Sequence, residues 1–260
     1  MTFDGYIRPD AAGFNGHLDS VKYKRESSRS KMSKMSPFSI TVYRGFAALP
    51  THTWSPFVNK LETRLRLSGI PYQVKVGSIH EGPKRKIPYI ALELDNGGSE
   101  MLGDTALISK RLVEVGVFPH ELNKDLTPVQ KAQDLAIRSL LEDKLSFYLA
   151  RERWIDNFYT MRDGAMASVP YPVRVLVGHL AYRGVSRSLY GQGTGRFTDD
   201  EVRMFKMEIW EHLNILLGEA RGSVKGKGSD EPFWILGGEK PTEADTTAYG
   251  IIVASLICDA

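Results

Sequence analysis

The sequence predicts a domain with a mixed β-sheet and two helices, followed by a domain built only of helices. Three observations support this α/β plus all-α prediction. Alternating apolar and polar β-formers are confined to the first half of the chain. The first two strands are separated by one helix-length segment, which makes them parallel, whereas an Asn-Gly-Gly turn joins two later strands as an antiparallel hairpin. Beyond Gly116 the strand patterns stop, and helix-capping motifs replace them.

The first half opens with a strand, a helix and a second strand. Residues 38–43 alternate apolar and polar side chains, which is typical of a half-buried strand. A helix is expected over 56–67, because Ser55 precedes a proline and a run of apolar residues near helical spacing. Gly69 ends that helix, and a second alternating strand follows at 72–76. These segments form a right-handed βαβ unit.

A hairpin and a second helix complete this half. Apolar strands are expected at 87–94 and 99–102, on either side of the Asp-Asn-Gly-Gly turn at 95–98. A helix follows, with apolar residues between Leu107 and Val113. The predicted order is therefore β-α-β-β-β-α.

The second half is predicted to be all helix. The capping box at 127–130 opens a helix that is expected to reach Trp154 or beyond. Another helix is expected over 173–190, after two prolines that break the chain. Similar capping boxes at 198–201 and 242–245 begin two further helices.

Composition excludes several classes of function. The formal net charge is +3, and seven basic against four acidic residues fall within residues 1–35. The rest of the chain is therefore neutral, and its one basic cluster, at 84–86, is too small for a nucleic-acid-binding face. No apolar stretch approaches the roughly 20 residues of a membrane-spanning helix. The single cysteine excludes an internal disulfide and a cysteine-rich metal site, and it fits the reducing cytoplasm, where we expect the protein.

The patterns divide the chain into segments. Residues 1–36 are polar and without apolar periodicity, so we expect a disordered leader; it lacks the apolar core of a signal peptide. The sheet-containing domain is expected at 37–116, a linker at 117–126 and the helical domain at 127–260.

Three motifs resemble the cytosolic glutathione transferase superfamily over residues 38–260. Lys-Ile-Pro-Tyr-Ile at 86–90 resembles the cis-proline segment of thioredoxin-like domains. Leu-Gly-Asp-Thr-Ala-Leu-Ile at 102–108 resembles the motif that holds the γ-glutamyl group. Leu-Gly-Gly-Glu-Lys-Pro-Thr-Glu-Ala-Asp at 236–245 resembles the signature of the helical domain. The resemblance implies a thioredoxin-like first domain and glutathione as cosubstrate.

Two further segments point to a branch of that superfamily. Residues 55–62 and 190–198 resemble the branch that contains failed-axon-connections proteins, metaxins and fungal transferases, including those that open the epoxide of trichothecene mycotoxins. The resemblance implies detoxification by conjugation of glutathione to a small apolar electrophile, here an epoxide of a trichothecene-type terpenoid, and a homodimer. A non-catalytic scaffold of the metaxin or failed-axon-connections type is the alternative.

Ser55 has two interpretations that are compatible. By its local sequence it is an N-cap with proline at the first helical position. By resemblance it lies where serine-type transferases carry their catalytic hydroxyl. A free thiol has a pKa of about 8.5, and a hydrogen-bond donor at the positive end of a helix favours the thiolate, which is the nucleophile. Thr53 and Tyr43 are the alternative hydroxyls.

The resemblance also implies the remaining site residues, and each has a structural alternative. The cis segment Ile87-Pro88 would pair with the glutathione backbone, although proline also simply begins strands. Asp104 and Thr105 would hold the γ-glutamyl group, or only cap a helix. Partners for the glycyl carboxylate are expected in the basic loop, where solvated charge is the alternative: His80 and Lys86. Residues expected to line the electrophile pocket, which could equally be core, are Trp54, Tyr148, Arg151 and Trp154. We expect no metal.

Glutathione transferases usually continue with helices that cover the one expected after residue 242. The present sequence ends soon after that helix, so residues 249–258 are expected to expose an apolar face. We therefore expect either a truncated helical domain or another surface that covers this face.

Overall fold

The computed structural model describes residues 38–45, 51–167, 169–224 and 231–260. The predicted leader at 1–36 lies outside the described residues. Residues 36–260 form one compact unit, so the predicted boundary between a sheet domain and a helical domain stays a prediction.

The sheet has four strands in the order β2-β1-β3-β4. Strand β1 (Phe38–Tyr43) pairs in parallel with β2 (Gln73–Lys75) and antiparallel with β3 (Tyr89–Leu94). Strand β4 (Ser99–Gly103) pairs antiparallel with β3 across the predicted Asn-Gly-Gly turn. The mixed sheet predicted from the sequence is confirmed.

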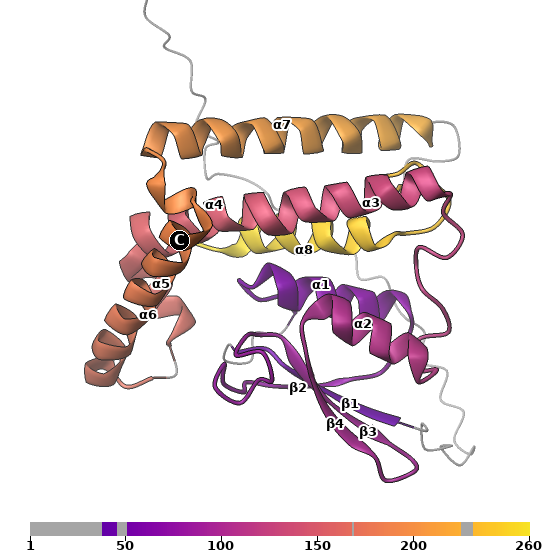
Figure 1. The fold of residues 1–260 in the computed structure, drawn as a ribbon, viewed down its shortest axis with the longest axis horizontal. Coiled ribbons are helices and arrows are strands. Elements are labelled where there is room, and N and C mark those ends of the chain that lie inside the picture. The colour runs from indigo at the N-terminus through magenta and orange to yellow at the C-terminus, as the bar shows by residue number, and fades with distance from the viewer. Residues whose placement is uncertain (1–37, 46–50, 168, 225–230) are drawn as a thin grey trace, which may run out of the picture. The chain divides into compact units, whose positions relative to one another are not determined.

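Helices α1 (Pro56–Leu67) and α2 (Thr105–Glu114) lie on the same side of this sheet (Figure 1). The core between the sheet and the two helices consists of alternate strand residues and one face of each helix. Its buried apolar side chains include Ile40, Val42, Leu61, Leu65, Ile90, Leu92, Ile108 and Leu112. Sheet and helices thus give the β-α-β-β-β-α order of a thioredoxin-like domain.

The second half contains only helices among its described residues. A continuous series runs through α3 (Pro128–Leu140), the π-helical segment η1 (Leu141–Leu145), α4 (Ser146–Arg151) and a second π-helical segment, η2 (Glu152–Asp156). The helix expected to reach Trp154 therefore does so, but with two π-helical interruptions. These interruptions place the side chains after residue 140 on a face that a regular helix would not give them.

Two helices and a short 3₁₀ turn follow this series. Helix α5 (Phe158–Ala165) leads to α6 (Tyr171–Gln192), which begins two residues earlier and ends two residues later than predicted. Pro172 is accommodated because the first turn of a helix has no intrahelical partner for its amides. The helix ends at Gly193, which has a φ of 115°. A 3₁₀ turn, η3 (Thr194–Arg196), connects α6 to the next helix.

Helices α7 (Asp199–Ser223) and α8 (Glu243–Ile257) begin at the predicted capping boxes. The Thr198 hydroxyl accepts from the amide of Glu201 at 3.3 Å, and the Glu201 carboxylate accepts from the amide of Thr198 at 2.8 Å. At α8 the carboxylate of Asp245 accepts from the amide and hydroxyl of Thr242, both at 2.8 Å. Burial raises the pKa of Asp245. These caps fix where both helices start.

Helix α8 joins the two halves, because it packs along α1 as well as along α3 (Figure 1). A Cβ atom at Gly250 would lie 2.4 Å from the carbonyl oxygen of Pro56, so the two backbones touch at this glycine. Nearby, Lys60 of α1 forms an ion pair of 2.5 Å with Glu142, and Arg64 forms one of 3.1 Å with Glu243. The halves are held together by close packing and by buried charge.

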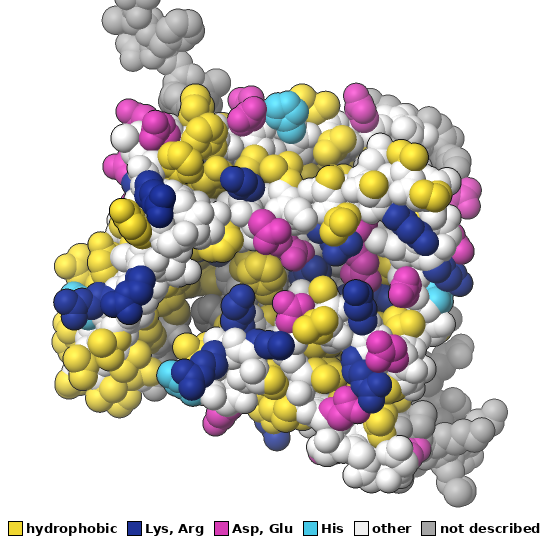
Figure 2. Space-filling view, in the orientation of Figure 1, with side chains coloured by type: hydrophobic (Ala, Val, Ile, Leu, Met, Phe, Trp, Pro, Cys, Tyr) yellow, Lys and Arg dark blue, Asp and Glu magenta, His cyan; other side chains and the backbone are white. Residues whose placement is uncertain are grey.

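Two groups of exposed apolar side chains lie on α8 and on α5 and α6. On α8, Tyr249 and Leu256 are exposed, whereas Ile251 and Ala254 are buried, so the apolar face expected over residues 249–258 is exposed only in part. A broader apolar patch covers α5 and α6, where many yellow side chains gather at the lower left of Figure 2. Its members that are at least half exposed include Tyr159, Tyr171, Val173, Leu176 and Leu180.

Candidate functional site

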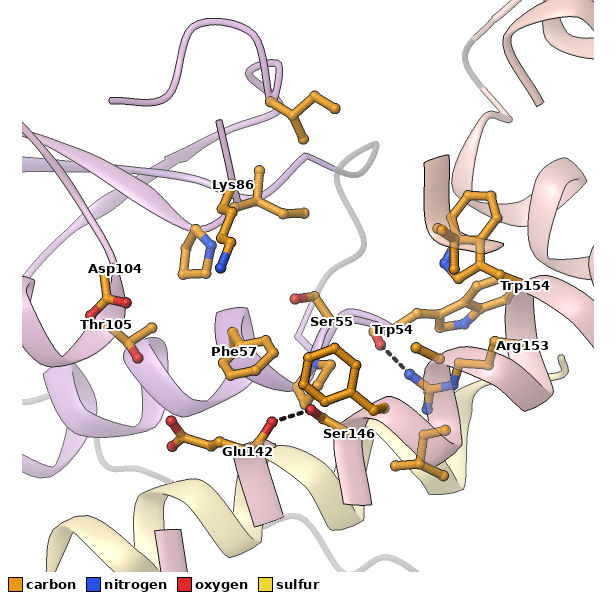
Figure 3. Close-up of a pocket in the computed structure, with 18 of the residues that line it drawn as sticks. Trp54, Ser55, Phe57, Lys86, Asp104, Thr105, Glu142, Ser146, Arg153 and Trp154 are labelled. Atoms are coloured by element: carbon orange, nitrogen blue, oxygen red, sulfur yellow. Dashed lines mark hydrogen bonds between the residues drawn. The ribbon is translucent and has the colours of Figure 1, made fainter. Parts of the chain in front are cut away.

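A cavity of about 620 Å³ separates the sheet-containing half from the helices (Figure 3). One wall is formed by the segment before α1, the loop between β2 and β3, and the start of α2. The other wall is formed by the η1–α4–η2 series, α5 and α6. Eight residues predicted for the site line it: Trp54, Ser55, Lys86, Ile87, Pro88, Asp104, Thr105 and Trp154.

Three predicted residues do not line this cavity. His80 is exposed in the loop between β2 and β3. Tyr148 is buried in the helical core against Phe205, with ring centroids 6.2 Å apart. Arg151 donates to the carbonyl oxygen of Phe197 at 2.6 Å.

Helical geometry explains why Tyr148 and Arg151 lie outside the cavity. Tyr148 and Arg151 are three residues apart and therefore share a helix face, and that face is directed toward α7 and η3. Phe147, Ala150 and Trp154 lie on the face directed toward the cavity. Tyr148 and Arg151, predicted to line the electrophile pocket, therefore lie outside this cavity.

Ser55 is the N-cap of α1, as predicted. Its hydroxyl accepts from the amide of Val58 at 3.4 Å, and Pro56 occupies the first turn. The side chain is directed into the cavity, on the side facing Lys86 (Figure 3). The hydroxyl proton remains available to a ligand, because the cap uses the oxygen only as an acceptor. The same group is therefore able to cap the helix and to donate a hydrogen bond.

Two buried side chains fix the segment that carries Ser55. Asn59 accepts from the amide of Thr53 at 2.9 Å and donates to its carbonyl oxygen at 2.8 Å. The Thr53 hydroxyl accepts from the amide of Ser55 at 3.2 Å. Thr53 is fully buried, and Tyr43 stacks on Tyr89 at 4.5 Å. Ser55 is therefore the hydroxyl of the three that lines the cavity.

The Ile87–Pro88 peptide bond is cis, and both residues line the cavity beside Lys86. The loop before them is held by Tyr89, whose hydroxyl donates to Glu81 at 3.0 Å and accepts from the amide of Ser78 at 3.2 Å. Burial raises the pKa of Tyr89, so its hydroxyl stays protonated. These bonds attach Ser78 and Glu81 of the loop to β3.

Asp104 and Thr105 lie at the start of α2. One carboxylate oxygen of Asp104 accepts from the amides of Ala106 and Leu107, at 3.0 and 3.2 Å. Asp104 has a φ of 76° and a ψ of 122°, a backbone conformation that residues other than glycine rarely adopt. Capping is thus its observed role, and the positive end of α2 faces the cavity with it.

The helical wall combines apolar and charged side chains. Its apolar members are Phe147, Leu149, Ala150, Trp154, Met161 and Val185, and Trp54 of the opposite wall lies against Gly164 of α5. Both π-helical segments contribute polar ones: Glu142 and Asp143 from η1, and Arg153 from η2. The carboxylate of Glu142 accepts from Lys60 at 2.5 Å and from Thr247 at 2.8 Å, which ties the wall to α1 and α8.

Arg153 is the most deeply buried cation of this wall, at 6% exposure. Its guanidinium donates to the carbonyl oxygens of Trp54 at 2.9 Å and of Ala254 at 2.8 Å. Burial lowers the pKa of Arg153, but an arginine remains protonated at neutral pH. Sequence patterns did not indicate Arg153, Asn59 or Glu142. Only the Asn59 contact, six residues away along the chain, is short enough to leave a local signal.

The chemistry available here is stabilisation of an anion next to an apolar surface. The hydroxyl of Ser55 and the start of α1 favour a negative charge, and Trp54 together with the apolar side chains of the helical wall favours an apolar molecule. In the part of the chain that the structure describes, no group of His, Cys, Asp and Glu is suited to hold a metal. None of the described helices is long and apolar enough to cross a membrane.

Comparison with known proteins agrees with this geometry. The sequence model of one protein family, the glutathione S-transferase N-terminal domain, matches residues 56–160. The isoprene-epoxide glutathione S-transferase of Rhodococcus sp. (strain AD45) is 27% identical over 226 residues, which cover 82% of this chain and 85% of that protein. Both matches show a similarity between this chain and glutathione S-transferases.

The glutathione transferase fold is also found in solved structures that resemble this one. Glutathione transferase GSTFuA2 from Phanerochaete chrysosporium superposes with a TM-score of 0.52 at 15% identity, over 85% of this chain and 86% of that one. At this identity the likeness concerns the fold alone: a thioredoxin-like mixed sheet followed by helices.

Proposed function

We propose that this chain is a serine-type glutathione transferase that conjugates glutathione to a small apolar electrophile. The observation that carries the proposal is the composition of one cavity. Around it lie the hydroxyl of Ser55, the cis Ile87–Pro88 segment and the start of α2, opposite a helical wall that includes Phe147, Trp154 and Met161. A hydroxyl, the main chain just before β3 and a helix start suit the thiol, the backbone and the charged end of glutathione, in that order.

Each part of glutathione has a partner of suitable chemistry. The main-chain groups of Ile87 pair with the cysteinyl backbone. Asp104 and Thr105 hold the γ-glutamyl ammonium and carboxylate, with the positive end of α2 favouring the carboxylate. Lys86 pairs with the glycyl carboxylate, and Arg85 lines the cavity beside it. His80 has no part in this arrangement, because it is exposed outside the cavity.

The proposed reaction is the opening of an epoxide. The thiol of glutathione loses its proton to solvent, and the hydroxyl of Ser55 donates a hydrogen bond to the resulting thiolate, which lowers the thiol pKa. The sulfur attacks an epoxide carbon, so that a carbon–sulfur bond forms while the carbon–oxygen bond breaks. The alkoxide then takes a proton from water.

An epoxide on an apolar carbon skeleton fits both the cavity and the relatives. The name of the Rhodococcus relative specifies isoprene epoxide, a hydrocarbon epoxide. The helical wall offers tryptophan, phenylalanine and methionine side chains to such a skeleton. We extend the proposed substrates to epoxides of trichothecene-type terpenoid toxins, which the enzyme would detoxify in the cytoplasm. We further propose that it acts as a homodimer and belongs to the fungal branch.

The test is a calorimetric titration with glutathione, followed by mass spectrometry of incubations with isoprene epoxide and with an epoxide-bearing trichothecene. We expect saturable binding of glutathione and a conjugate whose mass is the sum of both substrates. Binding without any conjugate would reject the epoxide as the electrophile. Absence of binding would reject the enzyme and leave the non-catalytic scaffold.

A further inference from the structure

We propose that Arg153 is a positioning residue for the hydroxyl of Ser55, which it aligns by holding the peptide group that precedes the serine. This inference rests on the proposed function, because it assigns a role within the same site. It assigns to the helical half of the chain a part in activating the thiol, in addition to binding the electrophile.

Two hydrogen bonds fix the peptide group between Trp54 and Ser55. Arg153 donates to the carbonyl oxygen of Trp54 at 2.9 Å, as Figure 3 shows. That oxygen belongs to the peptide group that ends in the amide of Ser55, and this amide donates to the hydroxyl of Thr53 at 3.2 Å. Both polar atoms of one peptide group are therefore fixed. Removal of Arg153 frees one of them, and the group can then rotate about the bonds that flank it.

Arg153 is itself held in place by burial and by a second carbonyl oxygen. Its guanidinium is 6% exposed and also donates to the carbonyl oxygen of Ala254 in α8 at 2.8 Å. A buried charge is stable only if its donors are paired, so the side chain has little freedom to leave these carbonyls. Trp54 is thereby connected to the last turns of α8, and α8 is itself packed against α1, which begins at Ser55. Arg153 therefore links the segment before α1 to α8, and α8 in turn contacts α1.

A separate contact, with Gly164, places the side chain of Trp54. A Cβ atom at Gly164 in α5 would lie 2.0 Å from the indole of Trp54, so the ring rests directly on the helix backbone there. Arg153 therefore holds the main chain of Trp54, whereas Gly164 accommodates its ring. Substitutions at the two positions are expected to differ in effect: the first on the thiol, the second on the electrophile.

The experiment follows the ultraviolet absorbance of the bound thiolate against pH in the full chain. The variants are Arg153→Met, Arg153→Lys and, as a control, Arg174→Met. Arg174 also donates to main-chain carbonyl oxygens, those of Ala167 and Val169 at 3.0 Å, but it does not line the cavity. Calorimetry gives the affinity for glutathione, and kcat is measured at neutral and at alkaline pH.

For Arg153→Met we expect the bound thiol to ionise about one pH unit higher, so that kcat at neutral pH falls about tenfold and recovers at alkaline pH. The affinity for glutathione should stay within about twofold of the original value. Arg153→Lys should give a smaller shift, because an ammonium group can still donate to the Trp54 carbonyl but lacks the fork that reaches both carbonyls. Arg174→Met should leave the profile unchanged.

An unshifted thiol titration in a folded Arg153→Met variant would overturn the inference while leaving the proposed function intact. If that variant does not fold, Arg153→Lys decides in its place, since it keeps the buried charge; an unshifted profile there has the same meaning. A shift of equal size in Arg174→Met would assign the effect to general destabilisation and also overturn the inference. Failure of the unsubstituted chain to bind glutathione would instead reject the function, and this role with it.

Discussion

The two walls of the cavity are built in different ways. The wall from the sheet-containing half uses contacts that are short in sequence: Ser55 caps an amide three residues away, and Asp104 caps amides two and three residues away. In the helical wall, Arg153 reaches carbonyl oxygens that are 99 and 101 residues away. The groups that would bind glutathione are thus locally determined, whereas their alignment and the electrophile's surroundings depend on how the halves pack.

The largest effect is expected in the locally determined wall. Ser55→Ala removes the donor to the thiolate, and loss of one such preorganised donor lowers kcat by about 100-fold or more. The measurement is the steady-state rate of conjugate formation at neutral pH. The same variant should also lose about 1 kcal/mol in the free energy of unfolding, because the helix cap is lost with it.

Ser55→Asp separates these two consequences. Aspartate caps a helix as well as serine does, but its carboxylate cannot donate a hydrogen bond to a thiolate. We expect near-normal stability together with activity as low as in Ser55→Ala. If the aspartate variant turned over normally, the hydroxyl would have no part in the mechanism.

The packing between the halves should show the next largest effect. In Gly250→Ala the new methyl group would meet the carbonyl oxygen of Pro56 at 2.4 Å, so α8 must move away from α1. Overpacking of this kind costs about 1–3 kcal/mol, to be measured as a loss in the free energy of unfolding in urea. Gly184→Ala in α6 is the matched control, because nothing lies within 4 Å of a Cβ atom there.

That control should raise stability by about 0.5–1 kcal/mol, since alanine is the better helix former. Equal effects at the two glycines would mean that contact between α1 and α8 does not limit stability.

Much of the locally determined part could be predicted from the sequence. Helix α1 was predicted with its observed ends, and the mixed sheet and three capping boxes followed from short patterns. Of the site residues proposed by resemblance, those in the sheet-containing half line the cavity, except His80.

The helical wall could not be predicted to the same degree. Tyr148 and Arg151 were chosen as polar or aromatic residues on a long helix, but helical periodicity does not tell which face meets which neighbour. The π-helical segments before and after α4 also rotate the faces that follow them. Arg153 left no local signal, because its partners lie in a distant loop and in α8.

A smaller effect is expected at the apolar wall. In Gly164→Ala the methyl group displaces the indole of Trp54 into the cavity, which should raise the KM for the electrophile about tenfold. The pH at which the bound thiol ionises should stay the same, since the carbonyl of Trp54 keeps its bond to Arg153. Initial rates at varied electrophile and saturating glutathione measure this. A change confined to the glutathione affinity would contradict the assignment of this wall.

The smallest effect concerns the start of α2. Asp104→Ala should lower the free energy of unfolding by about 1 kcal/mol through loss of the cap. Asp104→Asn should retain stability, because asparagine caps a helix as well as aspartate does and has nearly the same shape. It should nevertheless weaken glutathione binding, since the carboxylate that faces the γ-glutamyl ammonium is gone. Unchanged affinity in the asparagine variant, measured by calorimetry, would leave Asp104 as a cap only.

The central claim is that glutathione occupies this cavity with its sulfur beside Ser55. A crystal structure of the chain with glutathione tests it most directly. We predict the sulfur within hydrogen-bonding distance of the Ser55 hydroxyl, the cysteinyl backbone along Ile87 and the γ-glutamyl end at α2. Glutathione bound elsewhere, or with its sulfur directed away from Ser55, would contradict the account.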